Sequence, residues 1–156
     1  MNHQQPSASS GLTAFPDAFQ PRIPATICPL PLGLAPVSAG FPSPAEDYED
    51  KRLDINEYLV RNPVATFFFP VQGDSMQGAG ILDGDILVVD RSVTPQHGHI
   101  VVAFINGERL VKRLYKRAGR VALLAENPDY PALELSGDLE LLIWGVVVGK
   151  FQRVPA

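Results

Sequence analysis

The sequence predicts a mainly β protein of a twisted sandwich or barrel-like type, with one short helix and an extended N-terminal arm. Two observations support this prediction. From about residue 64 onward, short runs rich in β-branched and aromatic residues are separated by turns that contain glycine. Before residue 46, by contrast, the chain holds 9 of its 15 prolines. Proline at this density blocks both helix interiors and central strands.

The proline-rich arm, residues 1–39, carries almost no charge but many apolar side chains. Its charged side chains are Asp17 and Arg22 alone. A segment of this composition does not form a packed core by itself. We therefore expect an extended arm that docks on the body of the protein or on a partner chain. Ala39 and Gly40, at its end, offer an unhindered and flexible backbone, which suits either a protease site or a flexible joint in a linker.

The helix is predicted at about residues 54–61, after a linker at residues 40–52 that ends in a run of charged side chains. Asp54, followed three positions later by a glutamate, is typical of a helix N-terminus. Asn62-Pro63 ends the pattern, because the residue before a proline disfavours helical backbone.

Six apolar runs after the helix predict strands. The fourth of them follows Asn106-Gly107, which is a strong signal for a two-residue β-hairpin. We therefore expect the third and fourth strands to pair. The predicted strands lie at residues 64–72, 86–90, 99–105, 109–116, 121–124 and 141–151.

Length and composition restrict the class of protein. The chain has 156 residues, which suggests one folded domain, placed here at residues 53–156. Its 13 Lys+Arg and 17 Asp+Glu give a formal net charge of −4, which argues against strong non-specific DNA binding and favours protein partners. Cys28 is the sole cysteine, so no disulfide can form within the chain, as fits a cytoplasmic protein. No apolar run approaches the ~20 residues that span a bilayer, and no secretory signal is apparent.

Ser75 is the candidate nucleophile. It lies in Gly73-Asp74-Ser75-Met76, between the predicted strand at residues 64–72 and the glycine-rich turn Gln77-Gly78-Ala79-Gly80. A serine in a glycine-bounded turn at the end of a strand is exposed, and another backbone can approach it. The alternative is that this turn is only structural.

Lys112 is the candidate base. Side chains alternate between the two faces of a strand, so Lys112 shares a face with Leu110 and Leu114. Apolar neighbours favour the neutral form of a lysine, and a neutral amine can activate a serine hydroxyl. Ser75 and Lys112 are therefore candidates for a Ser/Lys dyad, a known variant of a nucleophile and its base. The alternative is a lysine at a sheet edge that reaches past its neighbours to water.

Two other groups of side chains are possible metal ligands. His97 and His99 lack a cysteine or carboxylate at ligand spacing, and a surface turn explains them better. Asp83 and Asp85 flank a glycine in what is better explained as a tight turn. We expect neither a metal nor a cofactor.

Several short motifs, in this order and spacing, resemble the UmuD-type SOS mutagenesis proteins of the LexA-like family of self-cleaving serine peptidases (S24 type). The resemblance covers roughly residues 37–151. The motifs are Gly40-Phe41-Pro42-Ser43-Pro44-Ala45, Gly73-Asp74-Ser75-Met76, Gly84-Asp85, Val88-Val89-Asp90, Val111-Lys112-Arg113-Leu114 and the turn Asn127-Pro128-Asp129-Tyr130-Pro131.

The resemblance implies a role for each matching residue. Ser75 matches the nucleophile, Lys112 the general base, and Ala39-Gly40 the bond that the protein cuts in itself. Ala39 departs from the cysteine of UmuD and is closer to LexA, while the first 36 or so residues have no matching motif. We expect the oxyanion formed on Ala39 to be held by backbone N–H groups of Asp74 and Ser75.

The resemblance also implies partners. It predicts a cytoplasmic homodimer whose cleavage is promoted by RecA filaments on single-stranded DNA. The shortened form would then join a UmuC-type polymerase in translesion synthesis. No direct sequence-specific DNA binding and no membrane association are expected.

Three other functions are alternatives to a self-cleaving peptidase. A signal peptidase also uses serine and lysine on a related β fold, but the absence of a membrane anchor counts against it. A LexA-like or phage repressor needs a helix-turn-helix before the cleavage site, which the proline-rich arm does not supply. A non-enzymatic dimeric binding module would use the Ser75 turn only as structure.

Overall fold

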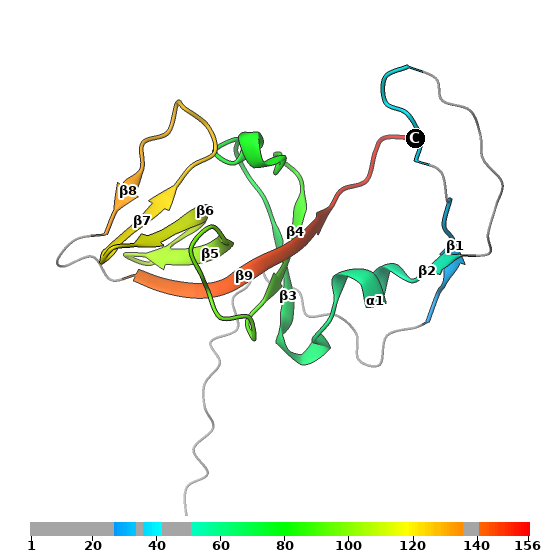
Figure 1. The fold of residues 1–156 in the computed structure, drawn as a ribbon, viewed down its shortest axis with the longest axis horizontal. Helices are drawn as coiled ribbons and strands as arrows, with labels where there is room; N and C mark the ends of the chain where they lie inside the picture. The colour runs from blue at the N-terminus through cyan, green and yellow to red at the C-terminus, as the bar shows by residue number, and fades with distance from the viewer. Residues whose placement is uncertain (1–26, 34–35, 42–50, 136–140) are drawn as a thin grey trace, which may run out of the picture.

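The protein is mainly β, as predicted, and most of its strands belong to one antiparallel sheet. The computed structural model describes residues 27–33, 36–41, 51–135 and 141–156. Its seven-stranded sheet has the order β3-β4-β9-β5-β6-β7-β8 (Figure 1). The strands are β3 (Thr66–Pro70), β4 (Ile86–Asp90), β5 (Ile100–Ile105), β6 (Glu108–Arg117), β7 (Arg120–Leu124), β8 (Leu133–Glu134) and β9 (Leu141–Phe151).

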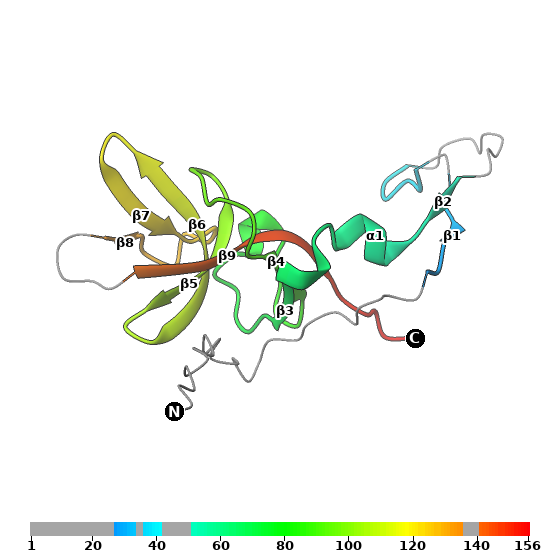
Figure 2. The same cartoon turned by 90° about the horizontal axis from the view of Figure 1, so that it is seen from below.

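The longest strand, β9, joins the two halves of this sheet because it pairs with β4 on one side and β5 on the other. Both pairings contain a register shift, at Val88/Val89 and at Val102/Ala103. Such irregularities bend a strand and increase its twist. The bent sheet seen from below in Figure 2 agrees with the predicted twisted β fold.

The predicted hairpin is confirmed at the tip of β5 and β6. The two strands pair from Ile100 with Arg113 to Ile105 with Glu108. Asn106 and Gly107 between them have φ angles of 50° and 82°, as the tightest hairpin turns require. This short connection fixes the register that places Val101 opposite Lys112.

Two hydrophobic clusters form the core, one on each face of the sheet. Val101 and Val102 are neighbours in β5 but belong to different clusters, because side chains alternate along a strand. The first cluster consists of Phe69, Met76, Ile81, Leu87, Val89, Val102 and Trp144. The second consists of Val101, Ala103, Leu114, Leu123 and Val146.

The predicted helix is present as α1 (Ile55–Leu59), shorter than the expected range of about 54–61. Asp54 caps it by accepting hydrogen bonds from the backbone N–H groups of Asn56 and Glu57. After α1, a short 3₁₀ turn, η1 (Pro63–Ala65), occupies the start of the predicted strand at residues 64–72. The strand itself therefore begins at Thr66.

Part of the arm docks on its own chain. Leu30 and Pro31 form β1, which pairs with β2 (Arg52–Leu53). The backbone N–H of Leu32 donates to Lys51 O at 2.8 Å, and that of Cys28 donates to the Asp54 carboxylate. This segment therefore contacts its own chain at residues 51–54, in a two-stranded sheet separate from the seven-stranded one, and residues 1–26 lie outside the described part of the chain.

Candidate active site

The loop between β3 and β4 presents Ser75. Gly73 starts its turn with a φ of 93°, a conformation that favours glycine, and its N–H donates to Asp83 Oδ1 at 2.7 Å. The two ends of the loop are tied together by backbone hydrogen bonds, from Val71 N to Asp85 O at 2.8 Å and from Gly84 N to Val71 O at 2.9 Å. Ser75 therefore sits in a closed loop and not on a free-moving segment.

An ion pair between a buried aspartate and a partly exposed lysine closes the far end of this loop. Asp85 is only 1% exposed, and its Oδ2 accepts from the N–H of Leu82 at 2.8 Å and from Lys150 Nζ at 2.9 Å. Burial by itself raises the pKa of Asp85, but these two hydrogen bonds and the charge of Lys150 hold that pKa below its ordinary value. The aspartates flanking Gly84 thus close the turn, as the sequence predicted, since Asp83 holds Gly73 and Asp85 holds Leu82.

Lys112 lies in the middle of β6, between β5 and β7. The strand pairs Lys112 with Val101, and the Lys112 side chain is 7% exposed. As the alternation predicted, Leu114 is also buried and Leu110 half-buried. Burial lowers the pKa of Lys112, because the interior disfavours its charged form. No carboxylate in the described part of the chain forms an ion pair with this amine.

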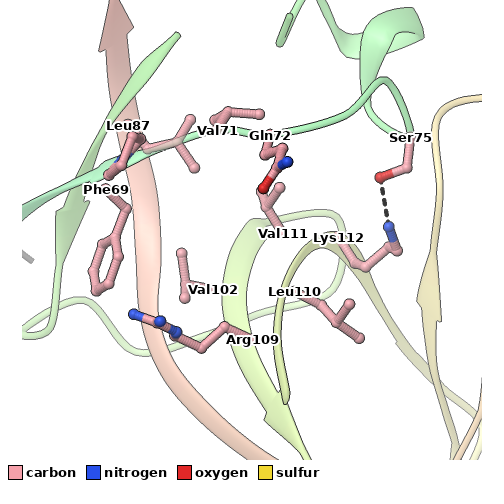
Figure 3. Close-up of a pocket in the computed structure, with 11 residues that line it drawn as sticks. Phe69, Val71, Gln72, Ser75, Leu87, Val102, Arg109, Leu110, Val111 and Lys112 are labelled. Atoms are coloured by element: carbon pink, nitrogen blue, oxygen red, sulfur yellow. Dashed lines mark hydrogen bonds between the residues drawn. The ribbon is translucent and has the colours of Figure 1, made fainter. Parts of the chain in front are cut away.

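The fold brings Ser75 and Lys112 together. Lys112 Nζ lies 2.6 Å from Ser75 Oγ and donates to it in the geometry shown in Figure 3. In the neutral amine the nitrogen has a lone pair, and the serine O–H then donates to it. The centroid of the Tyr130 ring lies 5.7 Å from Nζ. A serine and an amine that is easily deprotonated, at this distance, are arranged so that they can act as a nucleophile and its base.

The segment after β7, residues 126–130, holds the backbone around Ser75. The N–H of Glu126 donates to Ser75 O at 2.9 Å, and Gly78 N donates back to Glu126 O at 2.7 Å. The buried Asn127 donates from Nδ2 to Asp74 O at 3.1 Å, and the Tyr130 hydroxyl donates to Asp74 Oδ1 at 2.7 Å. The sequence shows this segment as an Asn/Tyr turn, but the motif alone does not indicate these contacts with the Ser75 loop.

A cavity of about 550 Å³ opens beside the dyad. Ser75 and Lys112 lie at one end of it, and the polar side chains of Gln72 and Arg109 also line it (Figure 3). Its floor is apolar and comes from β3, β4, β5 and β6. The apolar lining residues include Phe69, Leu87, Val102, Leu110 and Val111.

The predicted cleavage site is not at this cavity in the structure. Ala39 and Gly40 are exposed, and neither lines the cavity. Both cartoon views place the described segment 36–41 near β1 and β2, away from β6 (Figures 1 and 2). A Cβ added to Gly40 would meet nothing within 4 Å. A cut at this bond by Ser75 would therefore require segment 36–41 to move.

His97 and His99, the two possible metal ligands, accept hydrogen bonds from backbone N–H groups. His97 Nδ1 accepts from the N–H of Lys116, and His99 Nδ1 accepts from that of Gln96, each at 3.2 Å. Within the described ranges, no three His, Cys, Asp or Glu side chains are grouped as metal ligands. No helix in the same ranges is long and apolar enough to cross a membrane.

Comparisons with known proteins agree with the resemblance read from the motifs. A family model described as Peptidase S24-like matches residues 31–148. Protein MucA of Salmonella typhimurium is 48% identical over 140 residues, which cover 89% of this chain and 95% of MucA. Protein SamA of Salmonella typhimurium strain LT2 is 49% identical over 115 residues, covering 74% and 79%. The LexA repressor of Acidithiobacillus ferrooxidans is 46% identical over 125 residues, covering 77% of this chain and 59% of the repressor.

Proposed function

Since the chain belongs to the Peptidase S24-like family and is a self-cleaving serine peptidase, we propose that Ser75 and Lys112 cut its own Ala39-Gly40 bond as part of the SOS response. One observation supports this assignment above all others. Lys112 Nζ lies 2.6 Å from Ser75 Oγ, and the burial that lowers the pKa of Lys112 favours the neutral amine that a base must be.

The proposed reaction has two stages. The neutral amine of Lys112 takes the proton from Ser75 Oγ as that oxygen attacks the carbonyl carbon of Ala39. Backbone N–H groups of Asp74 and Ser75 stabilise the oxyanion, and the proton held by Lys112 passes to the leaving amine of Gly40 as the C–N bond breaks. Water, deprotonated by Lys112, then hydrolyses the ester and frees Ser75.

The cavity beside the dyad suits an extended peptide as substrate. Its apolar floor offers contacts for the side chains that flank the scissile bond. Val37 and Phe41, on either side of that bond, are 95% and 92% exposed in the present position. Movement of segment 36–41 into the cavity, on its own subunit or on a dimer mate, would bury them, so apolar burial favours the cleavage-competent arrangement.

Cleavage is proposed to act as a switch through the surface that it uncovers. The removed arm, residues 1–39, carries one aspartate and one arginine, so the formal charge of the remainder stays at −4. The arm includes β1, and its loss leaves β2 without the strand that pairs with it. A newly exposed strand edge beside the exposed Ile55 and Tyr58 of α1 is a surface that a partner can bind.

We assign the partners and domains on the family resemblance. The chain is proposed to form a cytoplasmic homodimer, with an arm at residues 1–39, a linker at 40–52 and a peptidase domain at 53–156. RecA filaments on single-stranded DNA would promote the cut. The shortened form would serve a UmuC-type translesion polymerase as an accessory subunit.

A non-enzymatic dimeric binding module is the second candidate, and the burial of Lys112 argues against it. Burying an amine without an opposing carboxylate lowers stability. A binding module has no need for such an amine, whereas a peptidase uses it as a base. A LexA-like regulator is a further candidate, but the arm before the cleavage site is too rich in proline for a helix-turn-helix.

Incubation of the purified full chain at alkaline pH tests the proposal. We expect two fragments, 1–39 and 40–156, identified by intact mass, and a rate that increases when RecA filaments on single-stranded DNA are added. Ser75→Ala should stay whole under both conditions. A wild-type chain that remains intact for days at pH 10, or a Ser75→Ala chain that is cut at Gly40, would contradict the proposal.

A further inference from the structure

We propose that Asn127 is a positioning residue for the oxyanion site, because it fixes the peptide group between Asp74 and Ser75. The proposal rests on the proposed function, since it concerns how the same site holds the oxyanion. Asn127 comes from the segment after β7 and is 5% exposed. Its side chain reaches back to the Ser75 loop, 53 positions earlier in the chain.

The orientation of the Asn127 amide is determined at both ends. Its Nδ2 donates to Asp74 O at 3.1 Å, and its Oδ1 accepts from the N–H of Asp129 at 3.0 Å. Exchanging nitrogen and oxygen would place two donors together at one end and two acceptors at the other. A further backbone bond, from Tyr130 N to Asn127 O at 3.1 Å, holds the turn that carries the side chain.

Because the peptide group is rigid, restraining its Asp74 C=O also fixes the direction of the Ser75 N–H. A peptide group is planar and trans, so its C=O and its N–H point in opposite directions. Holding Asp74 O toward Asn127 therefore directs the N–H of Ser75 away from Asn127. That N–H donates to no acceptor within the described ranges, which leaves it available for an oxyanion.

Asn127 is the contact that ties this carbonyl to another part of the molecule. Asp74 O also accepts from Gln77 N at 3.1 Å. Gln77, however, belongs to the same turn as Ser75, so that bond moves together with the peptide group. Asn127 lies in the segment after β7, outside this turn, so its hydrogen bond restrains the peptide group relative to the rest of the molecule. An oxyanion donor is effective only when its direction is fixed before the reaction.

The remaining anchors of the loop do not depend on the Asn127 side chain. Glu126 N donates to Ser75 O, and Gly78 N donates to Glu126 O, both through backbone atoms. Gly78 leaves no room for a side chain, because an added Cβ would lie 2.5 Å from Glu126 O. A substitution at Asn127 therefore removes the restraint on the Asp74-Ser75 peptide while the loop stays attached to the segment after β7.

The test compares self-cleavage rates of full-length variants across pH 7 to 11, each at a temperature at least 10 °C below its melting temperature. Removing an oxyanion donor costs about 10²–10³-fold in rate. Because loosening a donor costs less than removing it, we expect the alkaline plateau of Asn127→Ala to fall by about 10- to 100-fold. Its pH midpoint should not move, since the contact between Lys112 and Ser75 is untouched.

Two further variants keep the test decisive. Asn127→Asp retains the acceptor for Asp129 N but replaces the donor to Asp74 O with a carboxylate oxygen that repels it, so its plateau should fall by at least the same factor even if Asn127→Ala folds poorly. Its added charge favours protonated Lys112 and should raise the midpoint. Tyr130→Phe keeps the ring near Lys112 and removes only the bond to the Asp74 carboxylate, so it should lose less than about threefold in rate, well under the donor-removal range.

Three outcomes would overturn the inference. The first is a plateau within twofold of wild type in either Asn127 variant. The second is a shifted midpoint in Asn127→Ala, which would mean that Asn127 acts on the dyad. The third is a loss in Tyr130→Phe equal to that in Asn127→Ala, which would indicate general loosening of the loop. Cleavage by Ser75→Ala, by contrast, would refute the proposed function itself.

Discussion

Lys112 Nζ lies 2.6 Å from Ser75 Oγ although the two residues are 37 positions apart in the chain. The serine comes from a loop closed by backbone and carboxylate hydrogen bonds, and the lysine from the middle of a paired strand. Neither side chain has to move for a proton to pass between them. The proposed cut would also require the Ala39-Gly40 bond to be brought to Ser75, since both residues are exposed and outside the cavity.

Substitution of either member of the dyad is expected to abolish self-cleavage. Removing a nucleophile or its base from such a unit typically costs at least about 10³-fold, so Ser75→Ala and Lys112→Ala should show no fragment beginning at Gly40. Lys116→Ala is the matched control, because the Lys116 side chain lies on the same face of β6 as that of Lys112 but is exposed. Intact mass after incubation at pH 10 measures the result, and a Lys112→Ala chain cut at the wild-type rate would disprove the dyad.

Self-cleavage is expected to accelerate as the pH rises. The reactive form contains the neutral amine, and the fraction of neutral amine grows as the pH passes through the pKa of Lys112. Burial lowers that pKa from its ordinary value of 10.5, so the midpoint of the rate profile should lie below pH 10.5 and a plateau should follow. First-order rates over a pH series give both quantities. A rate that falls with rising pH, while the fold is intact, is incompatible with a lysine base.

Much of this fold could be predicted because its strands have strong local patterns. The apolar runs at β4 (Ile86–Asp90) and β9 (Leu141–Phe151) have the bounds that the sequence predicted. Asn106-Gly107 specified the hairpin, because its two residues adopt the positive φ angles that the turn needs. Alternation along β6 then correctly put Lys112 on the same buried face as Leu114.

The features that could not be predicted depend on contacts between distant segments. The strands β1, β2 and β8 have two residues each, which is too short for any periodic pattern. The bond from Asn127 to Asp74 requires the loop after β7 to return to the loop after β3. Its only sequence signal was a turn motif, and a turn motif does not identify the backbone group that its side chain will meet.

Gly40→Glu is expected to stop self-cleavage without harming the fold. In the structure nothing lies within 4 Å of a Cβ added to Gly40, so the uncut protein can accommodate the larger side chain. At Ser75 the same side chain would sit against the scissile bond and crowd the attack. We expect an unchanged melting temperature and at least about a 10²-fold loss of rate, as for a misplaced reacting group. Phe41→Leu serves as the control, and normal cutting of Gly40→Glu would move the cleavage site elsewhere.

Asp85→Asn is expected to lower stability at neutral pH but to have less effect in acid. The substitution keeps the shape of the side chain but replaces a charged acceptor of Leu82 N–H and Lys150 Nζ. Hydrogen bonds to charged groups contribute about 1.5–3 kcal/mol. Because the Lys150 side chain is 40% exposed, we expect a loss of about 1–2 kcal/mol at pH 7. Urea unfolding followed by circular dichroism measures this free energy.

The pH dependence of this loss follows from the direction of the pKa shift. The folded-state pKa of Asp85 lies below its ordinary value of 3.8, so the stabilisation by the carboxylate is fully present above that ordinary value. It is lost as the pH falls through the lower, folded value. The difference in unfolding free energy between wild type and Asp85→Asn should therefore shrink below about pH 4. Glu108→Gln, which removes an exposed carboxylate from the hairpin end of β6, should show a smaller difference throughout. A gap between wild type and Asp85→Asn that stays constant down to pH 2 would show that the carboxylate charge does not hold the Ser75 loop closed.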